Sequence, residues 1–128
     1  MIFIDTNYFL RLLLQDDDNQ HKKAEKLFLE AAEGKVLVFT SIIVIFEIYW
    51  VLKSHYKKTN RQIYEFLTKI LKMRFISLPE ANLLQETVQI FLQTNFGLED
   101  CYHLIYSKEF EAQNLATFDE KLLKEFNK

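Results

Sequence analysis

The residues best suited to chemistry are four acids at defined places in the chain. Asp5 and Asp119 each directly follow a short segment that is expected to be a strand, and Asp100 opens an expected helix. Glu47 is the only charged residue between Ile42 and Leu52. Carboxylates without His or Cys partners are hard oxygen ligands, and four of them at close range would repel one another without a cation. The pattern therefore predicts a Mg²⁺ or Mn²⁺ site.

The elements that must position these acids alternate along the chain. Strands are expected at about 1–4, 36–39, 74–77 and 114–118. Helices are expected at about 8–14, 21–33, 41–55, 60–72, 80–94, 98–110 and 120–126. This alternation predicts an α/β fold with a parallel sheet and helical crossovers. The carboxyl ends of parallel strands meet at one edge, so Asp5 and Asp119 are expected at the same edge of the sheet.

Each acid also has a purely structural interpretation. Residues 1–4 lack polar alternation, which is typical of a strand buried on both faces, and Asp5 could simply cap the helix that follows. The helix over 41–55 is apolar on all sides, which predicts a central helix with Glu47 buried inside it. That Glu could be satisfied by a buried cation or a backbone amide. The acidic triplet 16–18 is expected to solvate a loop and to cap the next helix.

Composition limits the class of protein. With 128 residues, 49% of them hydrophobic, the chain is expected to form one domain over 1–128. Two Gly and one Pro leave little turn chemistry for an all-β fold. Cys101 is the only cysteine, which excludes an internal disulfide and fits a reducing compartment. No signal peptide or membrane span is recognisable, so we expect a cytoplasmic protein without membrane partners.

Nucleic-acid binding would need a local basic patch, because the net charge is -2. Four basic residues follow the expected central helix with no acid among them, namely Lys53, Lys57, Lys58 and Arg61. They are either a solvated helix end or a surface for an anionic polymer. Arg11 is a further candidate for a phosphate contact.

Four segments resemble the PIN domain family, and within it the VapC-type toxin ribonucleases of toxin–antitoxin pairs. They are Ile4–Asn7, Thr40–Ser41 with Glu47, Leu98–Asp100 and Ala116–Asp119. The resemblance covers almost the whole chain. It implies a three-layer α/β/α domain with a short, mostly parallel central sheet of four strands, or five, flanked by helices. The sequence departs from the family pattern at Tyr106–Lys108, where small residues are common, and in lacking a strand after the last helix.

The resemblance implies a Mg²⁺- or Mn²⁺-dependent endoribonuclease. The acids that match the family's site are Asp5, Glu47, Asp100 and Asp119, of which Asp5, Asp100 and Asp119 match as metal ligands. The residues that match supporting positions are Thr6, Asn7 and Thr117. Glu47 would either hold a metal-bound water or act as general base. Divalent ions would reverse the repulsion between carboxylates and a phosphodiester and lower the pKa of a bound water.

The implied partners are an RNA substrate and a cognate antitoxin protein. Largely apolar helices and 12 Phe residues also favour a homodimer. Two other functions stay open. One is a phosphoryl-accepting α/β domain with an Asp and Mg²⁺, which gives no reason for Glu47. The other is a catalytically inactive PIN-like module that binds RNA or a protein.

Overall fold

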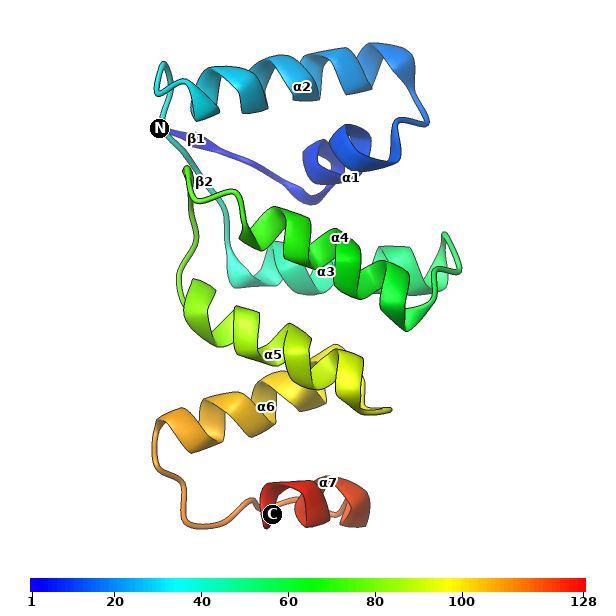
Figure 1. The fold of residues 1–128 in the computed structure, drawn as a ribbon, viewed down its shortest axis with the longest axis vertical. Coiled ribbons are helices and arrows are strands. Elements are labelled where there is room, and N and C mark those ends of the chain that lie inside the picture. The colour runs from blue at the N-terminus through cyan, green and yellow to red at the C-terminus, as the bar shows by residue number, and fades with distance from the viewer.

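Strands and helices alternate as predicted in the computed structural model, which describes residues 1–128 as an α/β fold. The elements in chain order are β1 (Ile2–Phe3), α1 (Thr6–Leu14), α2 (Asp18–Ala32), β2 (Val38–Phe39), α3 (Ile42–Ser54), α4 (Asn60–Leu71), β3 (Ile76–Ser77), α5 (Ala81–Gln93), α6 (Leu98–Glu109) and α7 (Glu120–Phe126). The helices are stacked along the long axis, with α2 and β1 toward one end and α7 at the other (Figure 1).

The three strands form a parallel sheet in the order β1-β2-β3, which confirms the predicted parallel pairing. Phe3 pairs with Phe39, and Phe39 pairs in turn with Ser77. Beyond the strands, the buried hydroxyl of Thr40 donates a hydrogen bond of 2.8 Å to the carbonyl of Ile4. This bond fixes the carboxyl ends of β1 and β2 side by side, immediately before the first acid of the site.

The predicted fourth strand over 114–118 is wrong, and so is a sheet of four strands. No backbone–backbone hydrogen bond involves these residues, and the side chain of Phe118 is fully exposed. The local sequence favours an extended chain, but a strand also needs a neighbour to pair with. Here the segment lies between α6 and α7, at the end of the molecule away from β1 (Figure 1).

The prediction that the first strand is buried on both faces is also wrong. Ile2 is 42% exposed and Phe3 is 48% exposed. The physical reason is the position of β1 at the edge of the sheet, since it pairs only with β2 and no fourth strand lies beyond it. An unbroken apolar run therefore marks an uncovered surface here, not a central strand.

Helix α3 is buried on only one side, so the prediction of a buried Glu47 is wrong. One stripe of the helix is buried and includes Ile45 and Ile48, whereas Ile43 is 67% exposed and Trp50 is 48% exposed. Glu47 is exposed. A helix that is apolar all round is expected in a core only if neighbours cover every side, and neighbouring helices cover only part of α3.

Side-chain caps start five of the seven helices, the exceptions being α5 and α6. Asp17 caps α2, because its Oδ1 accepts from the backbone N–H of Gln20 at 3.0 Å. Thr59 and Gln62 cap α4 reciprocally through a capping box. The acidic triplet thus serves the helix start, as expected. None of the seven helices is both long and apolar enough to cross a membrane.

Candidate active site

Asp5 occupies the turn between β1 and α1. Its Oδ1 accepts a hydrogen bond of 3.3 Å from the backbone N–H of Tyr8, so the residue does cap α1. The carboxylate is exposed, and no protein group donates to Oδ2. Capping and a ligand role are therefore compatible, because the cap uses one oxygen and leaves the other toward solvent.

Glu47 lies close to Asp5 through Thr6. The hydroxyl of Thr6 donates to Oε1 of Glu47 at 3.2 Å. Since Thr6 directly follows Asp5, this bond places Glu47 of α3 close to Asp5, the cap residue of α1. We call them the Asp5–Glu47 pair. The second carboxylate oxygen of Glu47 has no hydrogen-bond partner within the protein.

Asp100 and Asp119 form a second group, the Asp100–Asp119 pair. Both line a hollow of about 510 Å³ between α5, α6 and α7. Asp119 caps α7 by accepting from the N–H of Leu122 at 3.1 Å. The hydroxyl of Thr117 accepts from the N–H of Asp119 at 3.0 Å, which fixes the turn that presents this acid. Asp100 lies half-buried in the first turn of α6.

The structure does not bring all four acids to one point. No three acidic, His or Cys side chains lie close enough together to hold one metal ion. Helix α3 connects the two pairs, since Trp50, one turn beyond Glu47, donates its indole N–H to Glu99 beside Asp100. The carboxylate donors suit a hard divalent cation, which takes six or more oxygens. A complete site would need both pairs together.

None of the four acids forms an ion pair with a lysine, arginine or histidine. Buried acids need a cation or hydrogen bonds, but Asp5, Glu47 and Asp119 are exposed to water and only Asp100 is half-buried. The carboxylates of Asp5 and Asp119 each use one oxygen to cap a helix, and the carboxylate of Asp100 accepts no hydrogen bond. Their charge is therefore available to a bound cation, although most other acids of the chain, such as Asp17, are also without an ion pair.

The hollow beside Asp5 contains a basic residue that sequence reasoning missed. This hollow, of about 290 Å³, is lined by Asp5, Asn7, Tyr8, Arg11, Gln20 and Lys23. Lys23 is exposed and forms no ion pair. Lys23 lies three residues after Gln20 on α2, and this helical spacing places both side chains on the face toward α1. That spacing was the feature of the sequence from which its position beside Asp5 could have been predicted.

Arg11 is held mainly by its own loop. Its Nη1 lies 2.6 Å from Oδ1 of Asp16 and donates to the hydroxyl of Tyr56 at 3.3 Å. The hydrogen bond from Arg11 lowers the pKa of the Asp16 carboxyl below its ordinary value. The pKa of Arg11 is raised, chiefly by the Tyr56 hydrogen bond and then by Asp16. A phosphate contact by Arg11 would have to compete with this arrangement.

The predicted basic patch follows the end of α3. Lys53 donates to the hydroxyl of Tyr49 at 3.1 Å and lies 5.6 Å from the centre of the Trp50 ring. The other three basic residues of the patch, Lys57, Lys58 and Arg61, form no ion pair. Their charge is available to an anionic partner, and the proposed phosphate contacts stay a prediction.

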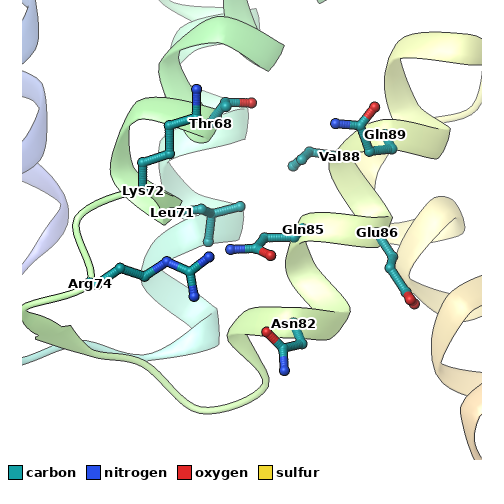
Figure 2. Close-up of a pocket in the computed structure, with 9 residues that line it drawn as sticks. All are labelled: Thr68, Leu71, Lys72, Arg74, Asn82, Gln85, Glu86, Val88 and Gln89. Atoms are coloured by element: carbon teal, nitrogen blue, oxygen red, sulfur yellow. The ribbon is translucent and has the colours of Figure 1, made fainter.

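The largest hollow, of about 620 Å³, lies between α4 and α5 and contains none of the predicted site residues. In Figure 2 the side chains of Arg74 and Gln85 extend toward each other from opposite walls. Most other lining side chains are amides or single charges, and the one acid is Glu86. This groove therefore offers no group of acids comparable with those described above.

Comparison with known proteins adds one finding. The model of the PIN domain family matches residues 2–127. PIN domains are generally nucleases and typically use divalent metal ions. No curated protein and no solved structure matches the chain. Because the family model covers nearly every residue, the chain belongs to the PIN domain family.

Proposed function

We propose that this PIN domain is a divalent-metal-dependent endoribonuclease that hydrolyses RNA phosphodiester bonds. The observation that carries the proposal is the match to the nuclease family, in which the four acids are grouped in two pairs that keep carboxylate oxygens free. Asp5, Glu47, Asp100 and Asp119 form no ion pair, in a chain that matches the nuclease family from residue 2 to residue 127. Uncompensated carboxylates close to one another are costly unless a cation binds them.

The chemistry follows from charge. A phosphodiester is anionic, so bare carboxylates would repel it. Bound Mg²⁺ or Mn²⁺ would supply positive charge at the reacting phosphate and a more acidic water. Asp5, Asp100 and Asp119 are the residues we assign to hold the ion. Glu47, with one oxygen fixed by Thr6, has its second oxygen free to accept a proton from the attacking water.

Basic residues around the acids would bind the RNA backbone. Lys23 lies in the same hollow as Asp5, and Lys57, Lys58 and Arg61 lie beyond the end of α3. Contacts to phosphates fix the register of a nucleic acid but carry no sequence information. The proposal therefore includes single-stranded RNA as substrate class without naming a target sequence.

The proposed biological role is the toxin of a type II toxin–antitoxin system, held inactive by a cognate antitoxin that covers the acids. Expression of the chain alone is expected to arrest growth, and expression of the Asp5→Asn variant is not. Growth arrest by both proteins would contradict a nuclease toxin, since the variant lacks a metal ligand.

The alternative is a PIN-like module that binds RNA or a protein without cleaving it. The separation of the acids into two pairs favours it, because no three acids share one point. The two functions differ in one observable, which is cleavage dependent on a divalent ion.

The test is a cleavage assay on labelled single-stranded RNA with Mg²⁺, with Mn²⁺ and with excess chelator. We expect cleavage with either ion, none with chelator, and none by Asp100→Asn. The matched control is Asp18→Asn, which also changes an acid in the first turn of a helix but lies outside both pairs. Binding of RNA without cleavage under every condition would establish the alternative, and cleavage in exhaustive chelator would refute the metal requirement.

A further inference from the structure

Helix α3 presents an exposed face that includes one acid of the site. Ile43, Glu47, Trp50 and Ser54 are all exposed, and their spacing of four, three and four residues places them on one side of the helix. Trp50 is 48% exposed and is the only tryptophan of the chain. A large aromatic ring is thus open to solvent one turn beyond Glu47, the acid that we assign to accept a proton.

Trp50 lies between the two pairs of acids. Toward the first pair, its neighbour on the helix face is Glu47, which accepts from Thr6 at 3.2 Å. Toward the second pair, the indole N–H of Trp50 donates to Glu99, the residue next to Asp100. Side chains three residues apart on a helix are neighbours. An RNA strand that contacts both pairs of acids therefore passes the Trp50 ring.

The ring of Trp50 is held in place by the protein itself. Its N–H is fixed by Glu99, and it packs edge-to-face on Tyr49 with the ring centres 5.2 Å apart. Tyr49 is buried and makes its own edge-to-face contact with Phe91. A side chain that is already ordered loses little conformational entropy when a ligand binds, so more of its contact energy contributes to affinity.

The surroundings of this ring suit a nucleotide. Every base has a flat π-face that can stack on an exposed aromatic ring, whatever the sequence. The ammonium of Lys53 lies 5.6 Å from the centre of the Trp50 ring, where it can meet the phosphate of a stacked nucleotide. An aromatic ring beside a cation is the combination with which proteins bind single strands. The charges of Glu47, Lys53 and Glu99 suit such a polar ligand better than an apolar protein surface.

We propose that Trp50 stacks on one unpaired base of the RNA and so holds the strand between the two pairs of acids. The inference rests on the proposed function for the identity of the ligand as RNA, but stacking itself requires no cleavage. A base within a duplex is covered by its neighbours and cannot offer its face to a protein ring. Trp50 thus selects unpaired RNA without reading its sequence.

The fluorescence of the single tryptophan provides the test. The wild-type protein is titrated at low salt in excess chelator, so that binding is measured without cleavage. The ligands are a single-stranded RNA, the same RNA in a duplex, and an abasic strand of equal length. Because stacking on a base quenches indole fluorescence, the single-stranded RNA should quench the emission strongly. The duplex and the abasic strand carry the same phosphates and should leave the emission nearly unchanged.

Two results of this titration would overturn stacking. One is equal quenching by the single-stranded RNA and the abasic strand, which would report the charge of the backbone and not a base. The other is a single-stranded RNA that does not bind, or that binds without altering the emission. The second result would favour a protein partner on this face of α3.

Substitutions distinguish stacking from a merely structural link between α3 and α6. Trp50→Leu removes the π-face and should weaken binding of single-stranded RNA by about five- to 150-fold. Trp50→Phe loses the hydrogen bond to Glu99 but keeps a ring, so it should retain most of the affinity. Equal losses in both variants would show that the hydrogen bond matters and the ring does not. The matched control is Leu29→Ala, which removes a 56% exposed apolar side chain from α2 and should leave the affinity unchanged.

The salt dependence of binding is an independent measurement. Stacking releases no counterions, so Trp50→Leu should lower the affinity without changing the slope of log affinity against log salt. Lys53→Gln should instead flatten that slope by about 0.7. A flatter slope for Trp50→Leu would show that this substitution disturbs phosphate contacts, and it would count against stacking.

These outcomes separate the inference from the proposed function. If the wild type never cleaves RNA but its emission is quenched by single-stranded RNA alone, the nuclease function fails and stacking stands. If the wild type cleaves RNA while a saturating single strand leaves its emission unchanged, stacking fails and the nuclease function stands.

Discussion

Thr6 donates a hydrogen bond of 3.2 Å to Glu47 and so joins the first turn of α1 to the middle of α3. The two residues are 41 positions apart in the sequence. The bond is exposed, so its contribution to stability should be small. Its consequence is geometric, because it fixes one oxygen of the acid that we assign to accept a proton.

The first prediction concerns this bond. Thr6→Val keeps the shape of the side chain and removes the donor, so the free energy of unfolding should fall by only about 1 kcal/mol. The cleavage rate should fall further, by about tenfold or more, as for other residues that orient a site. Denaturant unfolding and single-turnover cleavage measure the two effects. Thr6→Ser keeps the hydroxyl and should retain both the wild-type stability and the wild-type cleavage rate. Equal cleavage rates for Thr6→Val and Thr6→Ser would contradict the positioning role.

The second prediction separates a metal ligand from a helix cap. Asp5 and Asp17 both cap helices through Oδ1, and only Asp5 belongs to the proposed metal site, beside the Thr6–Glu47 hydrogen bond. Asn caps as well as Asp, so neither Asp5→Asn nor Asp17→Asn should lower the melting temperature in chelator. A hundredfold excess of Mg²⁺ over its dissociation constant should stabilise wild type and Asp17→Asn by about 2.7 kcal/mol. Asp5→Asn should gain much less.

Calorimetry or thermal melts with chelator and with Mg²⁺ check this prediction without any activity assay. An equal response of all three proteins to Mg²⁺ would show that Asp5 is a cap only. No response in any of them would remove the metal itself from the proposal.

The sequence predicted the local elements well, because local elements depend on nearby residues. The helix predicted at 120–126 is found at Glu120–Phe126, and the cap at Asp17 lies where the acidic triplet placed it. Spacing of apolar residues and capping chemistry act within one or two turns, so they can be read from a single chain. The parallel pairing of β1, β2 and β3 also followed from the alternation of strands and helices.

Burial and pairing were harder to predict, because they depend on what lies opposite. The apolar run at β1 and the apolar helix α3 indicated burial, yet Phe3 and Glu47 are exposed. No pattern within 114–118 reveals that the segment makes no backbone hydrogen bond to β1. For the same reason the sequence placed four acids in one site, whereas the single chain shows two pairs.

The third prediction concerns pH and the Arg11–Asp16 ion pair. The pKa of Asp16 is lowered from 3.8, mainly by the hydrogen bond from Arg11. The contribution of the pair to stability is therefore fully present above that pH and is lost as pH falls through the lowered pKa. The raised pKa of Arg11 keeps it charged throughout.

A double-mutant cycle with Arg11→Gln and Asp16→Asn measures the coupling as a function of pH. Because both side chains are partly exposed, we expect a coupling below about 1 kcal/mol at neutral pH, screened further by salt. The coupling should decline as the pH falls below 3.8 and vanish once the pH lies well below the lowered pKa of Asp16. A coupling that grows as the pH falls would contradict the assigned sign.

The fourth prediction concerns the single thiol. Cys101 is fully buried in α6, and burial raises the pKa of its thiol to about 11. At neutral pH the reactive thiolate is then scarce and shielded, so a thiol reagent should not label native protein and should label it in urea. The control is Ser54→Cys at an exposed helix end, which should add one fast-reacting thiol. Fast labelling of native wild type would show that α6 opens readily.

The last prediction tests which cations touch RNA. Each phosphate contact to a single strand steepens the dependence of log affinity on log salt by about 0.7. Lys57, Lys58 and Arg61 form no ion pair, so replacing each by Gln should flatten that slope by about this amount. Lys23→Gln should do the same, because its side chain lines the hollow beside Asp5. Arg11→Gln should change the slope less, since Arg11 is engaged by Asp16 and Tyr56.

Binding titrations in chelator over a range of salt keep cleavage from interfering. The control is Lys35→Gln, whose ammonium already pairs with Glu33 and lies on the loop between α2 and β2. If Lys35→Gln flattens the slope as much as Lys57→Gln, the salt dependence reports the overall charge of the chain and not a contact surface. If only Lys23 and the residues beyond α3 matter, the RNA backbone runs from the Asp5 hollow along α3, past Glu47.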